Sequence, residues 1–363
     1  MSIYALGLMS GTSMDGIDIA LINPLTHQLI DAQVYSYSHN IEQRLRQVMQ
    51  GHSFDMHFFA RLDRDVGLEF AAAASQFMST QSSDVQENLK VIGMHGQTIC
   101  HDIQINDAYT WQIGSPFPLY EMLNRPVVYD FRSKNVSQGG QGAPLAPIYH
   151  QAIFEKYKPA VVVNIGGISN ISCLIGNQPL YGFDIGPGNC LMDAWIHTRL
   201  GLTYDKDSAW AMTGKICQAL VNRLLTDPYF HQLPPKSIGK EYFSLTWLQD
   251  YLVEFNLNDE DVQATLCYFS ALLIANTVDE LNQTIQQVFI CGGGSKNKAL
   301  MQYLKDLLTN VQVMSTDEIG VSADFLEAMM MANLAWLRIN NKPLQLCHIM
   351  GGREHQLHGI ICE

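Results

Sequence analysis

Runs of apolar residues separated by polar ones divide this chain into strands and helices. Short continuous apolar runs predict buried strands at residues 3–9, 17–22, 89–94, 126–131 and 287–291, and a strand–turn–strand unit over 160–175. Apolar positions at helical spacing predict helices at residues 41–50, 55–79, 189–200, 212–226, 245–254, 259–284 and 325–337. Strands that alternate with helices predict an α/β architecture.

Two turns rich in glycine, serine and asparagine each join a pair of apolar strands. The first covers residues 10–16 and the second covers residues 164–172, about 155 residues later. This repeat predicts two similar halves. We assign residues 1–131, joined by the tail 345–363, to an N-terminal lobe and residues 132–344 to a C-terminal lobe. A glycine-rich stretch at 139–144 lies near that boundary.

Both hairpin turns have the composition of a polyphosphate site. Glycine lets the backbone approach a ligand, and its N–H groups then face phosphate oxygens. A plain tight hairpin is the alternative for one turn alone, but the matched second turn favours the phosphate site. Asp15 and Asp18 are placed to hold Mg²⁺. The expected ATP-binding residues are Gly11, Thr12, Ser13, Met14, Asp15, Gly16, Ile17 and Asp18 in the first turn, and Gly166, Gly167 and Asn170 in the second.

Asp184 is the candidate general base. It stands at a predicted strand end, directly before the turn Gly186–Asn189 and a helix. A carboxylate there can take a proton from a sugar hydroxyl or a water. The alternative is an aspartate that caps the helix.

A third glycine-rich turn, Gly292–Asn297, links a strand to a helix. We interpret Gly292, Gly293, Gly294 and Asn297 as a nucleoside-binding turn. A dinucleotide-binding oxidoreductase is a competing hypothesis, but the fingerprint spacing and its acidic residue are missing. The P-loop pattern and the Gly-x-Ser-x-Gly pattern of serine hydrolases are absent as well.

Three further sites have weaker signals. Glu327 could bond a sugar hydroxyl and Arg132 could pair with a carboxylate, although an exposed helix glutamate and a structural ion pair are the alternatives. His348, His355 and His358 lie in a tail where we find no acidic or thiolate partner at ligand spacing, so we expect no metal there.

Composition narrows the partners. The net charge of -13 disfavours nucleic acid and anionic membranes. The eight cysteines form no Cys-x-x-Cys pair, which indicates a reducing, cytoplasmic compartment. We see no secretory signal and no spanning apolar segment.

Taken together, the motifs resemble those of the anhydro-N-acetylmuramic acid kinases, within the superfamily of actin-like ATPases, sugar kinases and Hsp70 proteins. The matching stretches run along essentially the whole chain: Gly7–Asp18, Gly93–Thr98, Asp130–Arg132, Gly139–Pro147, Asn164–Asn170, Asp184–Asn189, Tyr204–Asp207, Pro234–Ser237, Asp261–Leu266 and Cys291–Gly294.

The resemblance implies a two-lobed actin-like ATPase fold, related to ribonuclease H, with duplicated mixed sheets flanked by helices and a central cleft. It also implies a reaction. ATP phosphorylates 1,6-anhydro-N-acetylmuramic acid on O6 while water opens the anhydro ring, giving N-acetylmuramic acid 6-phosphate and ADP in recycling of cell-wall murein. Asp184 matches the base that activates the water, and Arg132, Glu327, His95 and Gln97 match sugar-binding positions. The expected cofactors are ATP and Mg²⁺; a homodimer is left open.

Three residues depart from the family pattern. Asn135 stands where an aspartate is expected, Ser208 where glycine is usual and Lys240 where arginine is common. A nucleotide-dependent chaperone or filament protein of the same superfamily is the alternative function. Against it, the chain lacks an additional C-terminal peptide-binding region.

Overall fold

The computed structural model describes residues 2–11, 14, 16–103, 108–176, 180–234, 236–239, 242–281, 285–344 and 347–363. These residues divide into two compact units, Met1–Tyr149 with Phe325–Glu363 and His150–Asp324. The first division therefore falls inside helix α6 (Ala146–Phe154). The sequence had suggested divisions at 131/132 and 344/345, whereas the compact units divide at 149/150 and 324/325. Among the described residues, no helix is both long and apolar enough to cross a membrane.

Unit 1 is built on a mixed sheet. Its order is β12-β6-β4-β1-β2-β3, and β5 pairs with β4 beyond that path. Strands β1, β2 and β3 are antiparallel neighbours, whereas β4 runs parallel to β1 and β6 parallel to β4. The strands are β1 (Tyr4–Ser10), β2 (Ile17–Asn23), β3 (Gln28–Tyr35), β4 (Leu89–Asp102), β5 (Tyr109–Ile113), β6 (Val127–Tyr129) and β12 (Ile360–Cys362).

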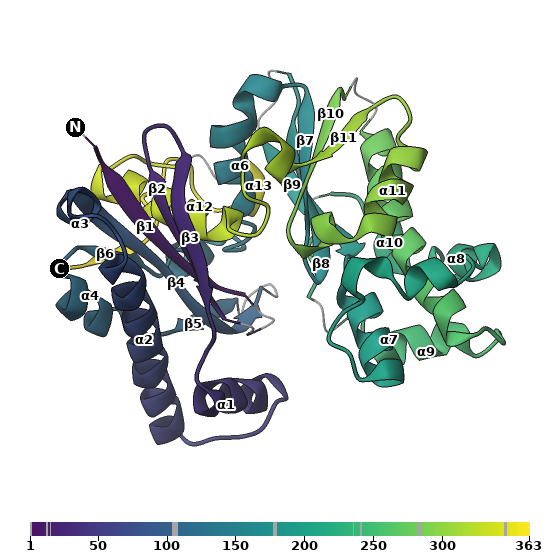
Figure 1. The fold of residues 1–363 in the computed structure, drawn as a ribbon, viewed down its shortest axis with the longest axis horizontal. Coiled ribbons are helices and arrows are strands. Elements are labelled where there is room, and N and C mark those ends of the chain that lie inside the picture. The colour runs from purple at the N-terminus through teal and green to yellow at the C-terminus, as the bar shows by residue number, and fades with distance from the viewer. Residues whose placement is uncertain are drawn as a thin grey trace. The chain divides into compact units, whose positions relative to one another are not determined.

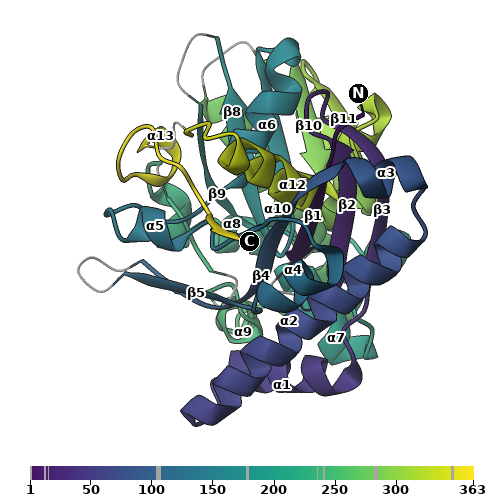
Figure 2. The same cartoon turned by 90° about the vertical axis from the view of Figure 1, so that its left-hand side faces the viewer.

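Helices cover both faces of this sheet (Figure 2). Large residues of the strands, such as Leu6 and Leu8, share a core with Phe70 and Phe77 of the long helix α2. The opposite face carries small residues. A Cβ on Gly7 would overlap the carbonyl of Ala328 in helix α12, so glycine is what permits this close approach. The helices are α1 (His39–Met49), α2 (Met56–Ser79), α3 (Ser83–Asn88), α4 (Phe117–Leu123), α5 (Ser133–Val136), α12 (Leu326–Ile339) and α13 (Cys347–Met350).

Unit 2 repeats this plan (Figure 1). Its sheet has the order β11-β10-β7-β8-β9, in which β7, β8 and β9 are antiparallel neighbours and β10 and β11 continue in parallel. Five strands of unit 1 therefore correspond to the five strands of unit 2: β1-β2-β3 to β7-β8-β9, and β4-β6 to β10-β11. Strands β5 and β12 have no counterpart among the described residues of unit 2. The strands are β7 (Ala160–Ile165), β8 (Ile168–Leu174), β9 (Tyr181–Pro187), β10 (Gln287–Cys291) and β11 (Gln312–Ser315).

Helices and short 3-10 turns complete unit 2. The core on one sheet face combines Val161 and Ile171 with Leu266 and Leu300 from two helices. On the other face, Phe154 and Tyr157 pack on Phe289. The elements are α7 (Cys190–Leu200), α8 (Gln218–Leu224), α9 (Leu245–Leu252), α10 (Asp259–Glu280), α11 (Lys298–Leu307), η1 (Glu155–Tyr157), η2 (Lys206–Ser208), η3 (Ala211–Thr213), η4 (Pro228–His231), η5 (Gly293–Lys296) and η6 (Thr316–Ile319).

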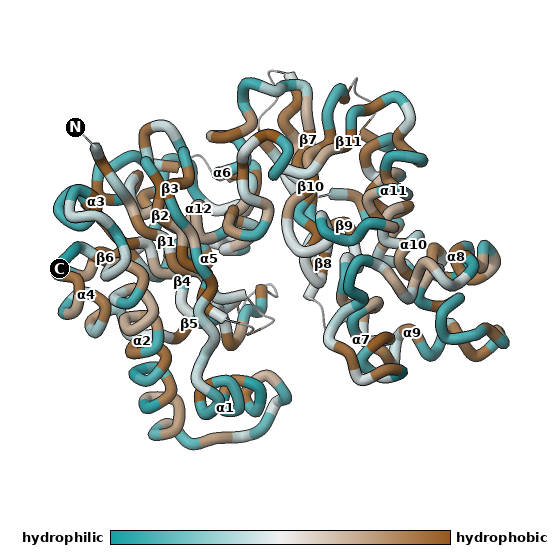
Figure 3. The backbone as a smooth tube through the Cα atoms, viewed as in Figure 1, coloured by the Kyte–Doolittle hydropathy of each residue, from teal (hydrophilic) through white to brown (hydrophobic). Residues whose placement is uncertain are grey.

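The hydropathy pattern predicts most of these elements, but two of them differ from the predicted ranges. Hydrophobic positions gather on β1 and β2, whereas α1 is largely hydrophilic (Figure 3). The strand expected at 89–94 continues to Asp102, because β5 pairs with its second half. The helix expected at 212–226 is confined to 218–224, because residues 211–213 form a 3-10 turn and the extended backbone at Gly214 interrupts the helix.

Candidate active site

Hydrogen bonds to Gln97 of β4 hold the first glycine-rich turn in place. The buried Ser10 hydroxyl lies 2.9 Å from the Gly16 carbonyl oxygen and 2.7 Å from Gln97 Oε1, and its single proton is shared between these two acceptors. Gln97 Nε2 in turn donates to the Gly11 carbonyl at 3.1 Å. Gln97 is fully buried, and its Nε2 also donates to the Thr98 carbonyl at 3.3 Å while its Oε1 accepts from the Tyr37 hydroxyl at 3.4 Å. The expected contact of Gln97 with the sugar stays a prediction. Asp18 lies on β2, opposite Met9 of β1. Thr12, Ser13 and Asp15 lie outside the described residues.

Arg132 and His95 form a paired group in unit 1. Arg132 donates from Nε at 3.1 Å and Nη2 at 3.0 Å to the same atom, His95 Nε2. That nitrogen must therefore accept, which leaves the proton on Nδ1, 3.0 Å from the Gly96 carbonyl. Burial, and next the charge of Arg132, lower the pKa of His95 to about 3. His95 is a neutral acceptor that fixes the guanidinium.

Glu327 supplies the opposite charge. It lies in the first turn of α12, where the helix dipole favours a carboxylate. Burial raises the pKa of Glu327, while the charge of Arg132 lowers it. Burial lowers the pKa of Arg132 to about 10, while Glu327 raises it. Three of the four expected sugar-binding residues, His95, Arg132 and Glu327, are thus in electrostatic or hydrogen-bond contact.

Asn135 supports this group through the backbone. Its Oδ1 accepts from the N–H of Gly142 at 2.7 Å, and the carbonyl of Gly142 accepts from Arg132 Nη1 at 2.8 Å. Asn135 Nδ2 donates to the carbonyl of Gly351 in the C-terminal segment at 3.1 Å. An aspartate, which the family pattern predicts at 135, could not donate to Gly351. The asparagine therefore matches the backbone around it.

The second glycine-rich turn has unused space and unused hydrogen-bonding groups. A Cβ built on Gly166 or Gly167 would meet no atom of the described chain closer than 3.6 Å. Beside them, Ser169 Oγ and Asn170 Oδ1 are buried with no hydrogen-bond partner among the described residues. Buried polar groups normally have partners, so this turn has the properties of a ligand site.

The Asp184 motif is attached to the same turn. Asp184 on β9 is the register partner of Asn170 on β8. Further along, the N–H groups of Gly188 and Asn189 donate to the carbonyls of Gly167 and Gly166, each at 2.8 Å. The structure thus brings the candidate base and the second glycine-rich turn together on adjacent strands.

Asp184 itself is partly buried. Burial raises its pKa to about 6, against the effect of hydrogen bonds from the Ile238 N–H and the Ser237 side chain and of the charge of Lys236. The Ile238 N–H donates to Oδ2 at 2.9 Å. At pH 7.5 the carboxylate is ionised and can accept a proton. It does not cap α7, whose N-cap is Asn189.

The third turn joins this group. Gly292 has φ 76°, and a Cβ there would overlap Asn164 Oδ1 on β7, so only glycine fits. Gly293, by contrast, would meet nothing closer than Asn189 Nδ2 at 3.8 Å. Asn297 caps α11 by accepting from the Leu300 N–H at 2.9 Å. The helix cap therefore accounts for part of what this asparagine does.

Ser208 stands where the family pattern has glycine, and its hydrogen bonds explain how a serine is accommodated there. Its φ of 57° lies in the left-handed region, which favours the glycine expected there. In compensation, its hydroxyl donates to Asn297 Oδ1 and accepts from the Ala299 N–H at 3.1 Å. Lys240 lies outside the described residues.

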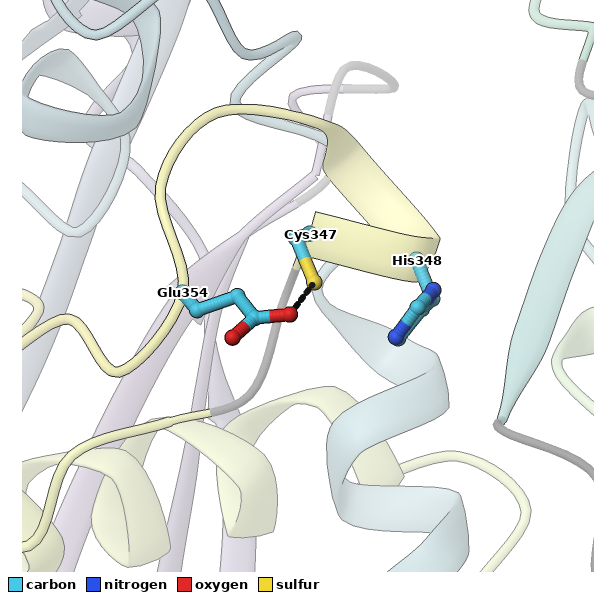
Figure 4. A group of neighbouring side chains, drawn as sticks. All are labelled: Cys347, His348 and Glu354. Carbon is cyan, nitrogen blue, oxygen red and sulfur yellow. Dashed lines mark hydrogen bonds between the residues drawn. The ribbon is translucent and has the colours of Figure 1, made fainter.

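One expectation about metal ligands is wrong. His348 does have a thiol and a carboxylate as neighbours, because one ligand atom each from Cys347, His348 and Glu354 lies within 4.8 Å of the others (Figure 4). Cys347 Sγ donates to Glu354 Oε1 at 3.6 Å. Burial and this carboxylate raise the pKa of the thiol. The thiol thus keeps its proton, which a metal ion would have to displace.

Residues around Asp184 were missed by sequence reasoning. Lys236 and Ser237 were noted as part of a motif but given no role, and Tyr229 was not noted at all. They approach Asp184 across 45 to 54 positions of sequence, as the Tyr229 and Ile238 contacts show. The motif Pro234–Ser237 was the available signal.

These features define first a class of protein. Duplicated mixed sheets, each with a glycine-rich hairpin between its first two strands, confirm the actin-like ATPase fold. Component A of (R)-2-hydroxyglutaryl-CoA dehydratase from Acidaminococcus fermentans matches the fold with a TM-score of 0.50 at 11% identity, over 93% of this chain and 100% of that one.

Sequence comparison then identifies the family. The family model described as anhydro-N-acetylmuramic acid kinase matches residues 3–363. The chain is 44% identical over 362 residues to the anhydro-N-acetylmuramic acid kinase of Legionella pneumophila (strain Corby), covering 99% of this chain and 98% of the relative. It is 40% identical over 360 residues to that of Vibrio vulnificus (strain CMCP6), with coverage of 98% and 97%. The chain belongs to the anhydro-N-acetylmuramic acid kinase family, a family of ATP-binding sugar kinases.

Proposed function

We propose that this protein phosphorylates 1,6-anhydro-N-acetylmuramic acid on O6 with ATP and opens the anhydro ring with water in the same event. The products are N-acetylmuramic acid 6-phosphate and ADP, in recycling of cell-wall murein. The observation that carries the proposal is the match of residues 3–363 to one family of sugar kinases. The groups in unit 2 support it.

ATP fits the glycine-rich turns of unit 2. Gly166, Gly167 and Gly293 leave space beside the backbone, and Ser169 and Asn170 have unused polar atoms. We assign the phosphates to the backbone N–H groups of Gly166 and Gly167, to Asn170 and to residues 11–18. We assign the nucleoside to residues 292–294 and 297. Mg²⁺ prefers oxygen ligands, and we assign it to Asp15 and Asp18. When bound, Mg²⁺ neutralises charge that develops on the phosphates.

Asp184 acts as the base. Its ionised carboxylate takes a proton from water as the water oxygen forms a bond to the anomeric carbon C1. The C1–O6 bond breaks, and its electron pair stays on O6. O6 then forms a bond to the γ-phosphorus while the bond from that phosphorus to the β-phosphate oxygen breaks, releasing ADP. One base thus serves both bond changes, because O6 is the leaving group of the first and the nucleophile of the second.

Arg132 and Glu327 bind the sugar. The lactyl carboxylate of the substrate suits a guanidinium, and Glu327 suits a hydroxyl donor. His95 holds Arg132 in place through two hydrogen bonds. We assign Gln97 to the sugar site as well. Its hydrogen bonds to Ser10 and Gly11 also hold the first glycine-rich turn. None of the eight cysteines forms a disulfide in the described structure, and we assign the protein to a reducing cytoplasm.

The test is ADP release with the purified chain. We expect release that requires ATP, Mg²⁺ and the anhydro sugar together. N-acetylglucosamine, which has no anhydro ring, is the matched control and should give no release. Absence of release with all three components present would contradict the proposal. Light scattering of the same sample decides between a monomer and a homodimer.

A further inference from the structure

A segment distant in sequence surrounds Asp184. The backbone N–H of Asp184 donates to the carbonyl of Lys236 at 3.0 Å, and the Ile238 N–H donates back to the Asp184 carboxylate at 2.9 Å. The hydroxyl of Tyr229 donates to the backbone carbonyl of Asp184 at 2.8 Å. The backbone and side chain of Asp184 are therefore both held by residues 229–238.

Lys236 is itself fixed within this segment. Its Nζ donates to the carbonyl of Tyr229 at 3.3 Å and lies 4.6 Å from the centroid of the Tyr229 ring. This is a cation–π arrangement in a partly buried place, where such a contact is stronger than at a fully exposed site. The ammonium group is thus held near Asp184 by Tyr229 and does not need an ion pair with the carboxylate.

The buried carboxylate of Asp227 holds the start of the segment 229–238. Asp227 is 3% exposed and accepts from the Tyr229 N–H at 2.9 Å, Trp247 Nε1 at 2.8 Å and the Tyr251 hydroxyl at 3.1 Å. The Tyr242 hydroxyl adds a further bond at 3.1 Å. Four donors around one buried carboxylate make a rigid support, so the position of Tyr229 is set by the core of unit 2.

We propose that Lys236 is a positioning residue for Asp184: its side chain, held on Tyr229, places an ammonium charge near Asp184, and its backbone carbonyl fixes the Asp184 backbone while the neighbouring Ile238 N–H orients the carboxylate. The proposal rests on the proposed function, in which Asp184 is the base.

The charges that face this pair are few among the described residues. Burial raises the pKa of Asp184 to about 6, and the charge of Lys236 acts in the opposite direction. Burial lowers the pKa of Lys236, whereas Glu280 at the end of α10 and Asp184 raise it. The pKa of Tyr229 is raised by burial and then by Asp184, so its hydroxyl stays protonated. Removal of the lysine charge therefore leaves burial less opposed, and the pKa of Asp184 rises.

This gives a signature in pH. A nearby opposite charge lowers a carboxyl pKa by about 1–3 units. The Lys236 charge acts on Asp184 less than the hydrogen bonds from Ile238 and Ser237 do, so we expect a shift of about one unit at most. In Lys236→Met we expect the acidic limb of kcat/KM to move up by about one pH unit. Activity is then strongly reduced near pH 6 and largely recovered at pH 8.5. Lys236→Arg keeps the charge and should keep the limb of the wild type.

The experiment combines kinetics with a direct titration. Profiles of kcat/KM from pH 5 to 9 are recorded for the wild type, Lys236→Met, Lys236→Arg and the exposed-lysine control Lys305→Met. The Asp184 carboxyl is titrated by NMR in protein with ¹³C-labelled aspartate, assigned by its loss in Asp184→Asn. A limb and a carboxyl resonance that move together in Lys236→Met alone support the proposal. An unmoved resonance overturns it, even where activity falls, because an equal loss at every pH indicates a contact with substrate or damage to the fold.

The NMR titration also separates the two proposals. If the wild type releases no ADP with the anhydro sugar, the proposed function fails, but the resonance still reports whether Lys236 controls the carboxyl. If Lys236→Met does not fold, Lys236→Gln, which keeps a polar end, replaces it under the same criteria.

Discussion

Replacement of Asp184 by asparagine should reduce turnover and raise stability at once. The carboxylate accepts from the Ile238 N–H at 2.9 Å, and the amide oxygen of asparagine can accept the same bond. The fold therefore keeps its support while the base is lost. General base catalysis supplies about 10²–10⁴-fold, so we expect a loss of that size in kcat. Binding of ATP, measured by calorimetry, should be nearly unchanged.

The stability gain follows from the pKa. Burial raises the pKa of Asp184 from 3.8 to about 6, which means that the folded state disfavours its ionised form. That shift corresponds to about 3 kcal/mol, and partial exposure together with weakened hydrogen bonds reduces the expected gain to about 1–2 kcal/mol. Because the folded pKa is the higher one, the penalty is fully present above pH 6 and disappears below about pH 4.

Thermal unfolding of wild type and Asp184→Asn at pH 7.5 and at pH 4 measures this difference. We expect the variant to melt a few degrees higher at pH 7.5 and no higher at pH 4. A variant that retains turnover within about tenfold of the wild type would refute the role of Asp184 as base. A variant that is less stable than the wild type at pH 7.5 would refute the reasoning about burial.

Three further substitutions test other parts of the site. Arg132→Lys loses the paired donation to one ring nitrogen and should raise KM for the sugar by about tenfold with a smaller effect on KM for ATP, measured by coupled ADP assay; equal effects on both would contradict a sugar-binding role. Gly292→Ala should weaken ATP binding and stability by more than about 2 kcal/mol, whereas Gly139→Ala, also at positive φ but in open space, should cost only about 1 kcal/mol, as measured by chemical unfolding. Glu354→Gln removes a carboxylate that raises the pKa of the Cys347 thiol, so alkylation by iodoacetamide at pH 8 should become faster; an unchanged rate would show that burial alone protects the thiol.

The parts of the site that the sequence predicts are local. Glycine-rich turns between apolar strands indicate the two hairpins, because the backbone conformation of a tight turn depends on the few residues that form it. Asp184 was expected at a strand end before a turn at Gly186–Asn189, but it lies inside β9 (Tyr181–Pro187), which continues through Gly186 and Pro187. The repeated strand–turn–strand pattern predicted two similar halves, and the matching strand order of the two sheets confirms this; the actin-like fold itself was expected from the family resemblance.

The parts that it could not predict depend on distant contacts. Ile238 reaches Asp184 across 54 positions, and Asn135 reaches Gly351 across 216. His95 and Arg132 belong to separate sequence motifs 37 positions apart, so their hydrogen bond could not be predicted from either motif. The strand expected at residues 89–94 continues to Asp102, because its second half pairs with β5, which comes later in the chain.

The central claim is that hydrolysis of the anhydro ring and phosphorylation of O6 are one reaction. The most direct measurement is mass analysis of the product formed in ¹⁸O-labelled water, with a short incubation and immediate borohydride reduction to prevent exchange at the anomeric carbon. We predict one ¹⁸O atom at the anomeric oxygen and none in the phosphoryl group of the sugar phosphate. A sugar phosphate without label at the anomeric oxygen would contradict the account.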